Sequence, residues 1–213
     1  EQLLPMVPML NTGKHTVLKG TPDGDDFLDT NIGYTSKIRD NETGIEQHFS
    51  LLEGHMERVL GRGGNNTIIL SREHDQTIEP GPGHNVVQIL HGETQGQKTI
   101  VSEGRDTLLL SEAFLDSASL KAMPGTNGIT LEGNDVMLDL QGNGLEAIRV
   151  INAEGRELFR LETNGLTAAE LNKQLFENAP WRDSPLSNPP TFSPQAGNSW
   201  QNYVIKQRDV ETA

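Results

Sequence analysis

The sequence predicts an all-β protein, specifically a parallel β-solenoid in which short strands wind into stacked coils. Through residues 61–110 a glycine, any residue, Asp or Asn, any residue and a large aliphatic residue recur in that order. The glycines Gly64, Gly83 and Gly104 are separated by 19 and 21 residues. Glycine is abundant, at 22 of 213 residues, as repeated tight turns require. Hydrophobic residues make up only 34%, which suits a thin core with one buried row per strand.

Aliphatic residues mark the positions that we expect to face inward. Weaker half-repeats lie between the strong ones, so the aliphatic anchors follow at intervals of about nine residues, which predicts coils of about 18 residues. Stacking is essential, because a single coil cannot bury its inward side chains alone. The predicted anchors of the central repeats are Ile68, Ile78, Val87, Ile100 and Leu108, and Val17 and Leu28 continue the row toward the N-terminus.

Further copies of the glycine–acid–aliphatic pattern carry a resemblance to a known family. They occur in TPDGDDFLD at 21–29, in GRGGNNTII at 61–69, and at residues 104–108 and 133–137. The pattern resembles the nonapeptide of the RTX (repeats-in-toxin) family, the haemolysin-type calcium-binding β-rolls, whose repeat reads Gly-Gly-x-Gly-x-Asp-x-aliphatic-x. The resemblance covers roughly residues 11–140. It implies a β-roll that holds calcium between stacked turns in a protein exported by a bacterium.

The turn positions of these copies supply the candidate calcium ligands, since calcium prefers several oxygen atoms from carboxylates, amides and carbonyls. Two alternatives stay open: the acidic residues of 21–29 form a solvated turn, or Asn66 and Asn85 form a metal-free amide ladder. The opposite edge carries Gln76 and Lys98, and Lys98 would place a cation where a metal should be, so we expect that edge to be metal-free. The six candidate ligands are Asp23, Asp26, Asn66, Asn85, Asp106 and Asp135.

The remaining segments predict three regions along the chain. A solenoid is expected over residues 1–140, terminal strands and a capping helix over 141–179, and a Pro-rich extended tail over 180–213. The helix is predicted at 165–179, with Thr167 as N-cap and Glu170 completing a capping box. Residues 32–53 are less regular and read either as two imperfect coils or as an insertion, and 107–124 reads as a strand followed by a polar, Ser-rich stretch.

Charge and missing motifs exclude several function classes. The net charge of −13 argues against nucleic acid and anionic membrane surfaces as partners, and favours cation binding or solubility. No apolar run is long enough to span a membrane. The absence of cysteine excludes disulfides and thiolate metal sites. The six histidines form no HExxH pair, and neither a P-loop nor a nucleophile elbow occurs.

The missing motifs favour a non-catalytic module, and the resemblance to RTX repeats implies that it is secreted and extracellular. The first expectation is a calcium-binding C-terminal repeat module of a large bacterial toxin, adhesin or hydrolase, which folds on calcium outside the cell and supports export or target binding. The alternative is a solenoid module that binds a host-surface receptor or a glycan with little or no dependence on calcium. A third candidate is a β-helix enzyme that acts on polysaccharides.

Overall fold

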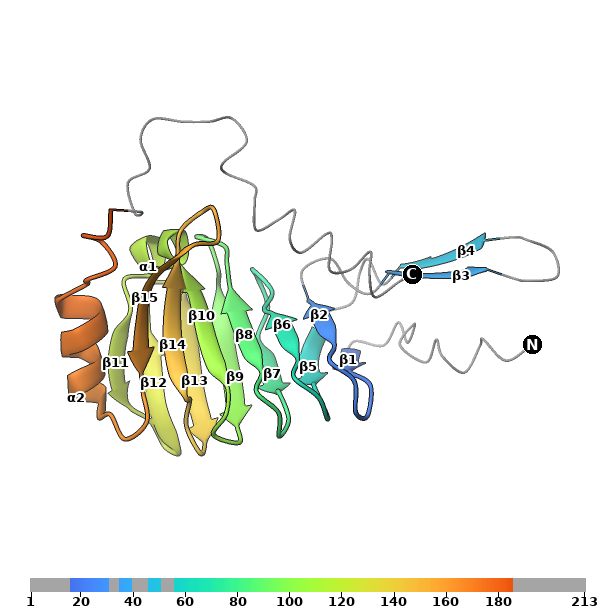
Figure 1. Ribbon diagram of the computed structural model, residues 1–213, viewed down its shortest axis with the longest axis horizontal. Coiled ribbons are helices and arrows are strands. Elements are labelled where there is room, and N and C mark those ends of the chain that lie inside the picture. The colour runs from blue at the N-terminus through green and yellow to red at the C-terminus, as the bar shows by residue number, and fades with distance from the viewer. Residues whose placement is uncertain (1–15, 31–34, 40–45, 51–55, 186–213) are drawn as a thin grey trace.

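The computed structural model describes residues 16–30, 35–39, 46–50 and 56–185. Within these ranges the protein is mostly β, with two sheets of mainly parallel strands and two short helices (Figure 1). The predicted all-β class is therefore confirmed. None of the helices in the described ranges is long and apolar enough to cross a membrane.

The larger sheet has seven strands in the spatial order β1-β5-β7-β9-β13-β12-β11. All neighbours pair in parallel except β13, β12 and β11, which form an antiparallel end. Its strands are β1 (Thr16–Lys19), β5 (Met56–Leu60), β7 (Gln76–Glu79), β9 (Gly96–Ser102), β13 (Val136–Gly142), β12 (Gly128–Glu132) and β11 (Lys121–Pro124).

The smaller sheet has six strands in the order β15-β14-β10-β8-β6-β2, of which only β15 runs antiparallel to its neighbour. The hairpin that joins β14 to β15 turns at residues 152–155, where Asn152 N donates to Arg156 O at 3.0 Å. Its strands are β2 (Phe27–Asp29), β6 (Thr67–Ile69), β8 (Val86–Ile89), β10 (Thr107–Ser111), β14 (Ala147–Ile151) and β15 (Glu157–Glu162).

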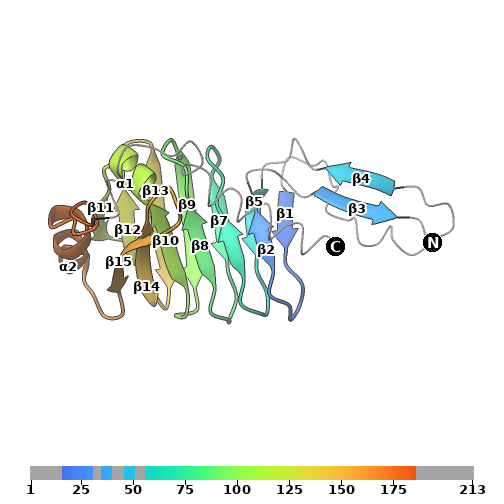
Figure 2. The same ribbon diagram turned by 45° about the horizontal axis from the view of Figure 1, so that its top comes forward.

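From β5 to β10 the chain alternates between the two sheets, so β5, β6, β7 and β8 each pair with the strand two places later (Figure 2). The register sets equivalent repeat positions side by side, as in Ile68↔Val87 and Val87↔Leu108. All five central anchors predicted from the repeat are 0% exposed and lie in one hydrophobic core. The repeat period therefore identified the inward positions correctly.

The N-terminal strand β1 departs from the predicted row. Val17, expected to face inward, is 37% exposed, whereas Leu18 is 3% exposed and joins the core. The pairing of β1 with β5 shifts register between Thr16 and Val17. Because side chains alternate along a strand, a slip of one residue exchanges the inward and outward positions.

The irregular segment 32–53 contains an insertion rather than two coils. Strands β3 (Thr35–Arg39) and β4 (Glu46–Ser50) pair antiparallel with each other in a separate two-stranded sheet. The two main sheets resume at β5, which pairs in parallel with β1.

A helix, α1 (Glu112–Ala118), follows β10 where the sequence predicted only a polar stretch. The Ser111 side chain caps it by accepting from Phe114 N at 3.1 Å. Phe114 and Leu115 are buried in the core. The prediction failed because seven residues give too short a window for helical periodicity, and the burial of Phe114 and Leu115 is a tertiary effect.

The predicted C-terminal helix is present as α2 (Ala168–Leu171), which continues as the π-helical turn η3 (Asn172–Glu177). The capping box is confirmed, because the Thr167 side chain accepts from Glu170 N while Glu170 accepts from Thr167 N. The Asn172 side chain bonds to both N and O of Ala122 in β11, at 2.6 and 2.7 Å. The helix thus closes the β11 end of the larger sheet.

Replacing Thr167 by alanine should lower the free energy of unfolding by about 1 kcal/mol, because the cap to Glu170 N is lost. Urea denaturation followed by far-UV circular dichroism measures the change. Thr167→Ser keeps the hydroxyl and should stay close to wild type. If both variants lose the same free energy of unfolding, the loss of the cap is not the cause of the destabilisation.

The Pro-rich tail begins with an ordered contact. The Trp181 side chain is 2% exposed, lies in the core, and donates from Nε1 to Leu175 O at 3.0 Å. Residues 186–213 of the predicted tail lie outside the described residues.

Candidate functional site: two polar edges and an outer sheet face

Four residues directly before strands of the smaller sheet form a continuous ladder, which we call the inner ladder: Asp26, Asn66, Asn85 and Asp106. Asp26 N donates to Asn66 Oδ1 at 3.0 Å, and Asn66 N donates to Asn85 Oδ1 at 2.7 Å. Asn85 Nδ2 then donates to Asp106 Oδ1 at 2.8 Å. Asn66, Asn85 and Asp106 are each 0–1% exposed. The sequence predicted that these three would stack, and the described fold brings them together.

The amide group of Asn66 is surrounded by backbone carbonyls. Its Nδ2 donates to Gly61 O at 3.1 Å, Gly63 O at 3.2 Å and Pro80 O at 3.2 Å. The first two carbonyls belong to its own turn and the third to the next turn. A calcium ion between the turns would bind to the same carbonyl oxygens. Here the neutral NH₂ group of Asn66 bonds to them instead.

Asn85 repeats this arrangement one turn further on. Its Nδ2 donates to Gly81 O and Gly83 O, both at 3.0 Å, in addition to Asp106 Oδ1. Every polar atom of this buried amide therefore has a partner, which is what allows it to lie inside a sheet edge.

Asp106 is the last member of the inner ladder, and one of its carboxylate oxygens accepts no hydrogen bond from the described residues. Its Oδ2 is buried and has no hydrogen-bond partner among the described residues, although the Ser102 hydroxyl lies beside the carboxyl group and favours its charged form. Burial raises the pKa of the Asp106 carboxyl above its usual range, and the side-chain and backbone N–H groups of Asn85 oppose that shift. A proton or a cation would therefore satisfy the unpartnered oxygen of Asp106.

A second column, the outer ladder, runs along the same edge through residues 25, 65 and 84. Asn65 N donates to Asp25 Oδ1 at 2.7 Å, and His84 N donates to Asn65 Oδ1 at 2.9 Å. Gly64 holds a positive φ of 83°, and a Cβ there would lie 2.1 Å from Gly24 O. Only glycine allows turns to stack this closely.

The other three predicted ligands divide between the two sheets. Asp26 accepts from Thr21 N at 2.6 Å through Oδ2, so its carboxylate closes its own turn. Asp23 is exposed in that turn. Asp135 is also exposed and precedes β13 in the larger sheet, away from the other candidates, so it cannot share an ion with them.

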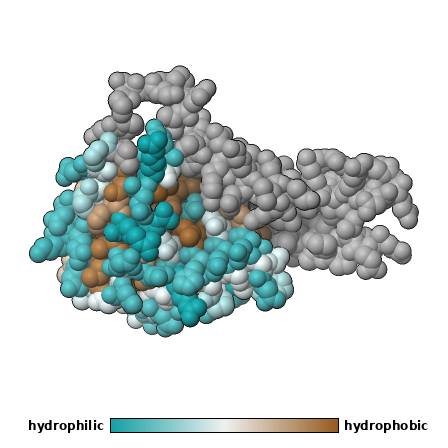
Figure 3. All heavy atoms as spheres, in the orientation of Figure 1, coloured by the Kyte–Doolittle hydropathy of each residue, from teal (hydrophilic) through white to brown (hydrophobic). Residues whose placement is uncertain are grey.

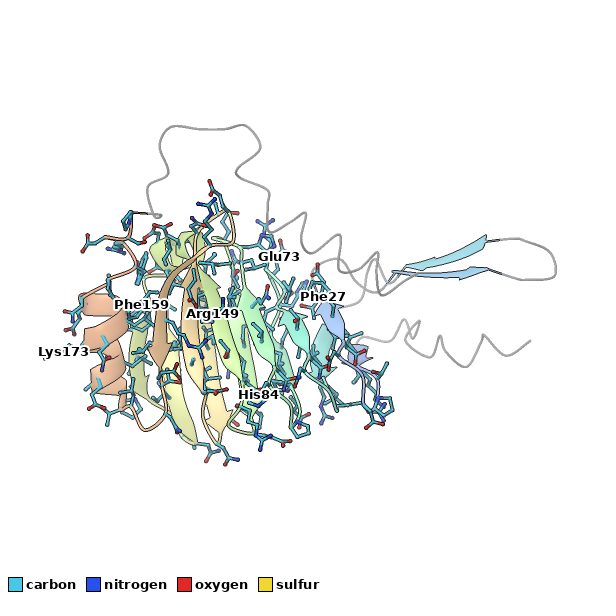
Figure 4. All side chains as sticks on the ribbon, in the orientation of Figure 1. Phe27, Glu73, His84, Arg149, Phe159 and Lys173 are labelled. Carbon is cyan, nitrogen blue, oxygen red and sulfur yellow. The ribbon has the colours of Figure 1, made fainter. Side chains whose placement is uncertain are left out.

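The opposite edge contains a buried ammonium group. Lys98 is 0% exposed, pairs in register with Gln76, and donates from Nζ to Ser71 Oγ at 3.2 Å and to His74 O. Burial lowers the pKa of Lys98 from 10.5 to about 8, and the charge of Asp75 partly opposes this. Figure 4 labels Glu73 and His84, which mark the two turn edges at opposite sides of the molecule. That the Lys98 edge is free of metal remains a prediction.

The outer faces of the two sheets differ in character. On the smaller sheet a second hydrophobic cluster faces away from the core, and Figure 3 shows hydrophobic residues gathered between hydrophilic ones on the side turned to the viewer. Figure 4 labels Phe27 of this cluster on the edge strand β2. The larger sheet instead carries a polar pocket of about 490 Å³ across β5, β7 and β9. The cluster consists of Phe27, Ile69, Leu90, Leu109 and Ile151.

The described residues contain no group of three or more His, Cys, Asp or Glu side chains placed to hold a metal ion. Two features of the edges and faces were not predicted from the sequence. The first is that Asn85 Nδ2 donates to turn carbonyls. The repeat carries Asn at some copies and Asp at others, and this exchange could have suggested the role, because an amide can donate a hydrogen bond and a carboxylate cannot. The pocket on the larger sheet has no sequence motif, because its lining comes from three strands and the turn before β7.

Comparison with known proteins found no match: no family model, no curated protein and no solved structure is similar to this chain at a significant level.

Proposed function

We propose that this chain is a non-catalytic β-solenoid binding module of a secreted bacterial protein, related to RTX repeats, whose stacked turns are held by side chains rather than by obligatory calcium. Its partner would be a glycan or a host-surface receptor. The alternation of strands between two sheets and the repeat pattern support the solenoid assignment. The observation that carries the proposal is the inner ladder, in which the Asn66 and Asn85 amides bond to the turn carbonyls.

The energetic reasoning concerns charge. A turn that binds calcium needs carboxylates, and without the ion their repulsion opposes folding. At Asn66 and Asn85 the ladder is neutral, and each amide both accepts from a neighbouring backbone N–H and donates to carbonyls. Such hydrogen bonds stabilise the stack whether or not calcium is present.

The protein is therefore expected to be folded in the presence of a calcium chelator. Far-UV circular dichroism and urea denaturation with excess chelator should give a cooperative unfolding transition with a β-rich starting spectrum. A disordered spectrum in chelator that becomes β-rich near millimolar calcium would contradict the proposal and favour a calcium-dependent module.

Calcium binding is the second candidate, and one observation favours it: the buried Asp106 Oδ2 has no partner among the described residues. An ion beside this oxygen would neutralise the carboxylate and draw on carbonyls of the adjoining turns. In that case calcium would add stability to a chain that is already folded.

Replacing Asp106 by asparagine separates these two candidates. In chelator at pH 7 Asp106→Asn should raise the free energy of unfolding by about 1–2 kcal/mol, because it removes a buried charge and supplies a donor for the turn carbonyls, as at Asn85. The pKa of Asp106 is raised, so wild type should lose stability relative to the variant as pH rises through that pKa.

Urea denaturation of both proteins, with chelator and with millimolar calcium, measures this difference. A wild-type gain in calcium that Asp106→Asn abolishes would establish the second candidate. A variant less stable than wild type in chelator at every pH would refute the role given to Asp106.

A further inference from the structure

The outer face of the larger sheet carries a regular row of polar residues. Thr77 pairs in register with Thr99, Thr99 with Asp139, and Asp139 with Thr130. These residues face outward because their neighbours in sequence, such as Ile78 and Ile100, are 0% exposed in the core. The row crosses β7, β9, β13 and β12 at the strand spacing of about 4.8 Å.

The two threonines lie in the pocket of about 490 Å³, a volume in the range of small-ligand sites. The side chains of Thr77, Thr99 and Gln97 make no hydrogen bond with any of the residues that the structure describes, and all three line this pocket. They offer two hydroxyls and one amide that can each donate and accept hydrogen bonds.

Charge limits the class of ligand. The carboxylates of Glu57 and Asp75 line the same pocket, and Asp139 continues the row. His74 is the basic residue among the lining side chains, and the ammonium of Lys98 is buried within the edge. An anionic ligand would meet like charges here, whereas an uncharged ligand rich in hydroxyl groups would find donors and acceptors.

We infer that this outer face, centred on Thr77 and Thr99, binds a neutral polysaccharide that lies across the strands. The strand spacing is comparable with the advance per sugar residue of an extended glycan, so successive sugars can meet successive strands. No Phe, Tyr or Trp side chain lines the pocket, so affinity comes mainly from hydrogen bonds and is weak, with a dissociation constant on the order of 0.1–1 mM. This inference rests on the proposed binding function and specifies its site and ligand class.

The test is isothermal titration of the full chain with three neutral hexasaccharides, cellohexaose, maltohexaose and chitohexaose, and with anionic hexagalacturonate. The variant Thr77→Val/Thr99→Val removes both hydroxyls at nearly constant volume. Thr67→Val, on the outer face of the smaller sheet, is the matched control. Circular dichroism of each variant verifies the fold.

We expect at least one neutral hexasaccharide to bind wild type and Thr67→Val alike, and to bind the double variant at least tenfold more weakly. Unchanged affinity in the double variant would overturn this site while leaving a glycan-binding module in place elsewhere. Absence of binding by all three neutral sugars, or equal binding of hexagalacturonate, would overturn the ligand class. Folding in chelator, measured separately, tests the calcium-independent proposal and does not depend on these outcomes.

Discussion

Asn85→Ala should lower the free energy of unfolding by about 3–5 kcal/mol, the largest effect that we expect from a single substitution. The change removes the acceptor of Asn66 N and the donor to Gly81 O, Gly83 O and Asp106 Oδ1. The bonds to Asn66 N and Asp106 Oδ1 are buried, whereas those to Gly81 O and Gly83 O are partly buried. Each buried polar group left without a partner costs about 1–3 kcal/mol. Losses in a shared network do not add fully, which keeps the expected total below their sum.

Urea denaturation in chelator measures this loss, with Asn143→Ala as the control. Asn143 is exposed and its Nδ2 donates to Glu103 O at 3.3 Å, so its replacement should change stability by less than about 0.5 kcal/mol. A loss at Asn85 no larger than that at Asn143 would show that the inner ladder does not hold the turns together.

The second large effect concerns Lys98 and pH. Because burial lowers the pKa of Lys98 from 10.5 to about 8, the unfolded chain binds more protons than the folded protein between these two pH values. The free energy of unfolding should therefore rise as the pH increases from about 8 to about 10.5. The rise is about 1.4 kcal/mol for each pH unit, or about 3 kcal/mol in total. Lys98→Met keeps the length of the side chain and removes the proton, so it should lack this rise.

The measurement is urea denaturation at pH values from about 7 to about 11, a range that includes the ordinary lysine pKa of about 10.4. Lys121→Met, at an exposed position in β11, is the matched control and should follow wild type. Parallel pH profiles for wild type and Lys98→Met would mean that burial does not lower the pKa of Lys98 in the folded protein.

Much of the fold could be predicted from the repeat alone. The five central anchors, the stacking of Asn66, Asn85 and Asp106, and the capping box at Thr167 all follow from local patterns. The anchors and the capping box depend on residues within one strand or one turn, and the stacking of the three ladder residues follows from their regular spacing in the repeat.

Other features could not be predicted because their partners are distant in sequence. Helix α1 is short and depends on burial of Phe114 in the core. Strand β13 pairs with β9 only after α1, β11 and β12 have intervened, so its register follows from packing. The register slip at Val17 arises from pairing between β1 and β5, which lie on either side of the β3–β4 insertion.

By itself, the sequence determined where the chain turns and which aliphatic residues point inward, because glycine geometry and strand alternation act over a few residues. Only the tertiary structure decided what the polar residues at the edges bond to. The Asn66 amide reaches Pro80 O in the next turn, and the Lys98 ammonium reaches Ser71. Those partners become neighbours only when successive turns stack, so the sequence marks the polar edges while the stacked fold selects their hydrogen bonds.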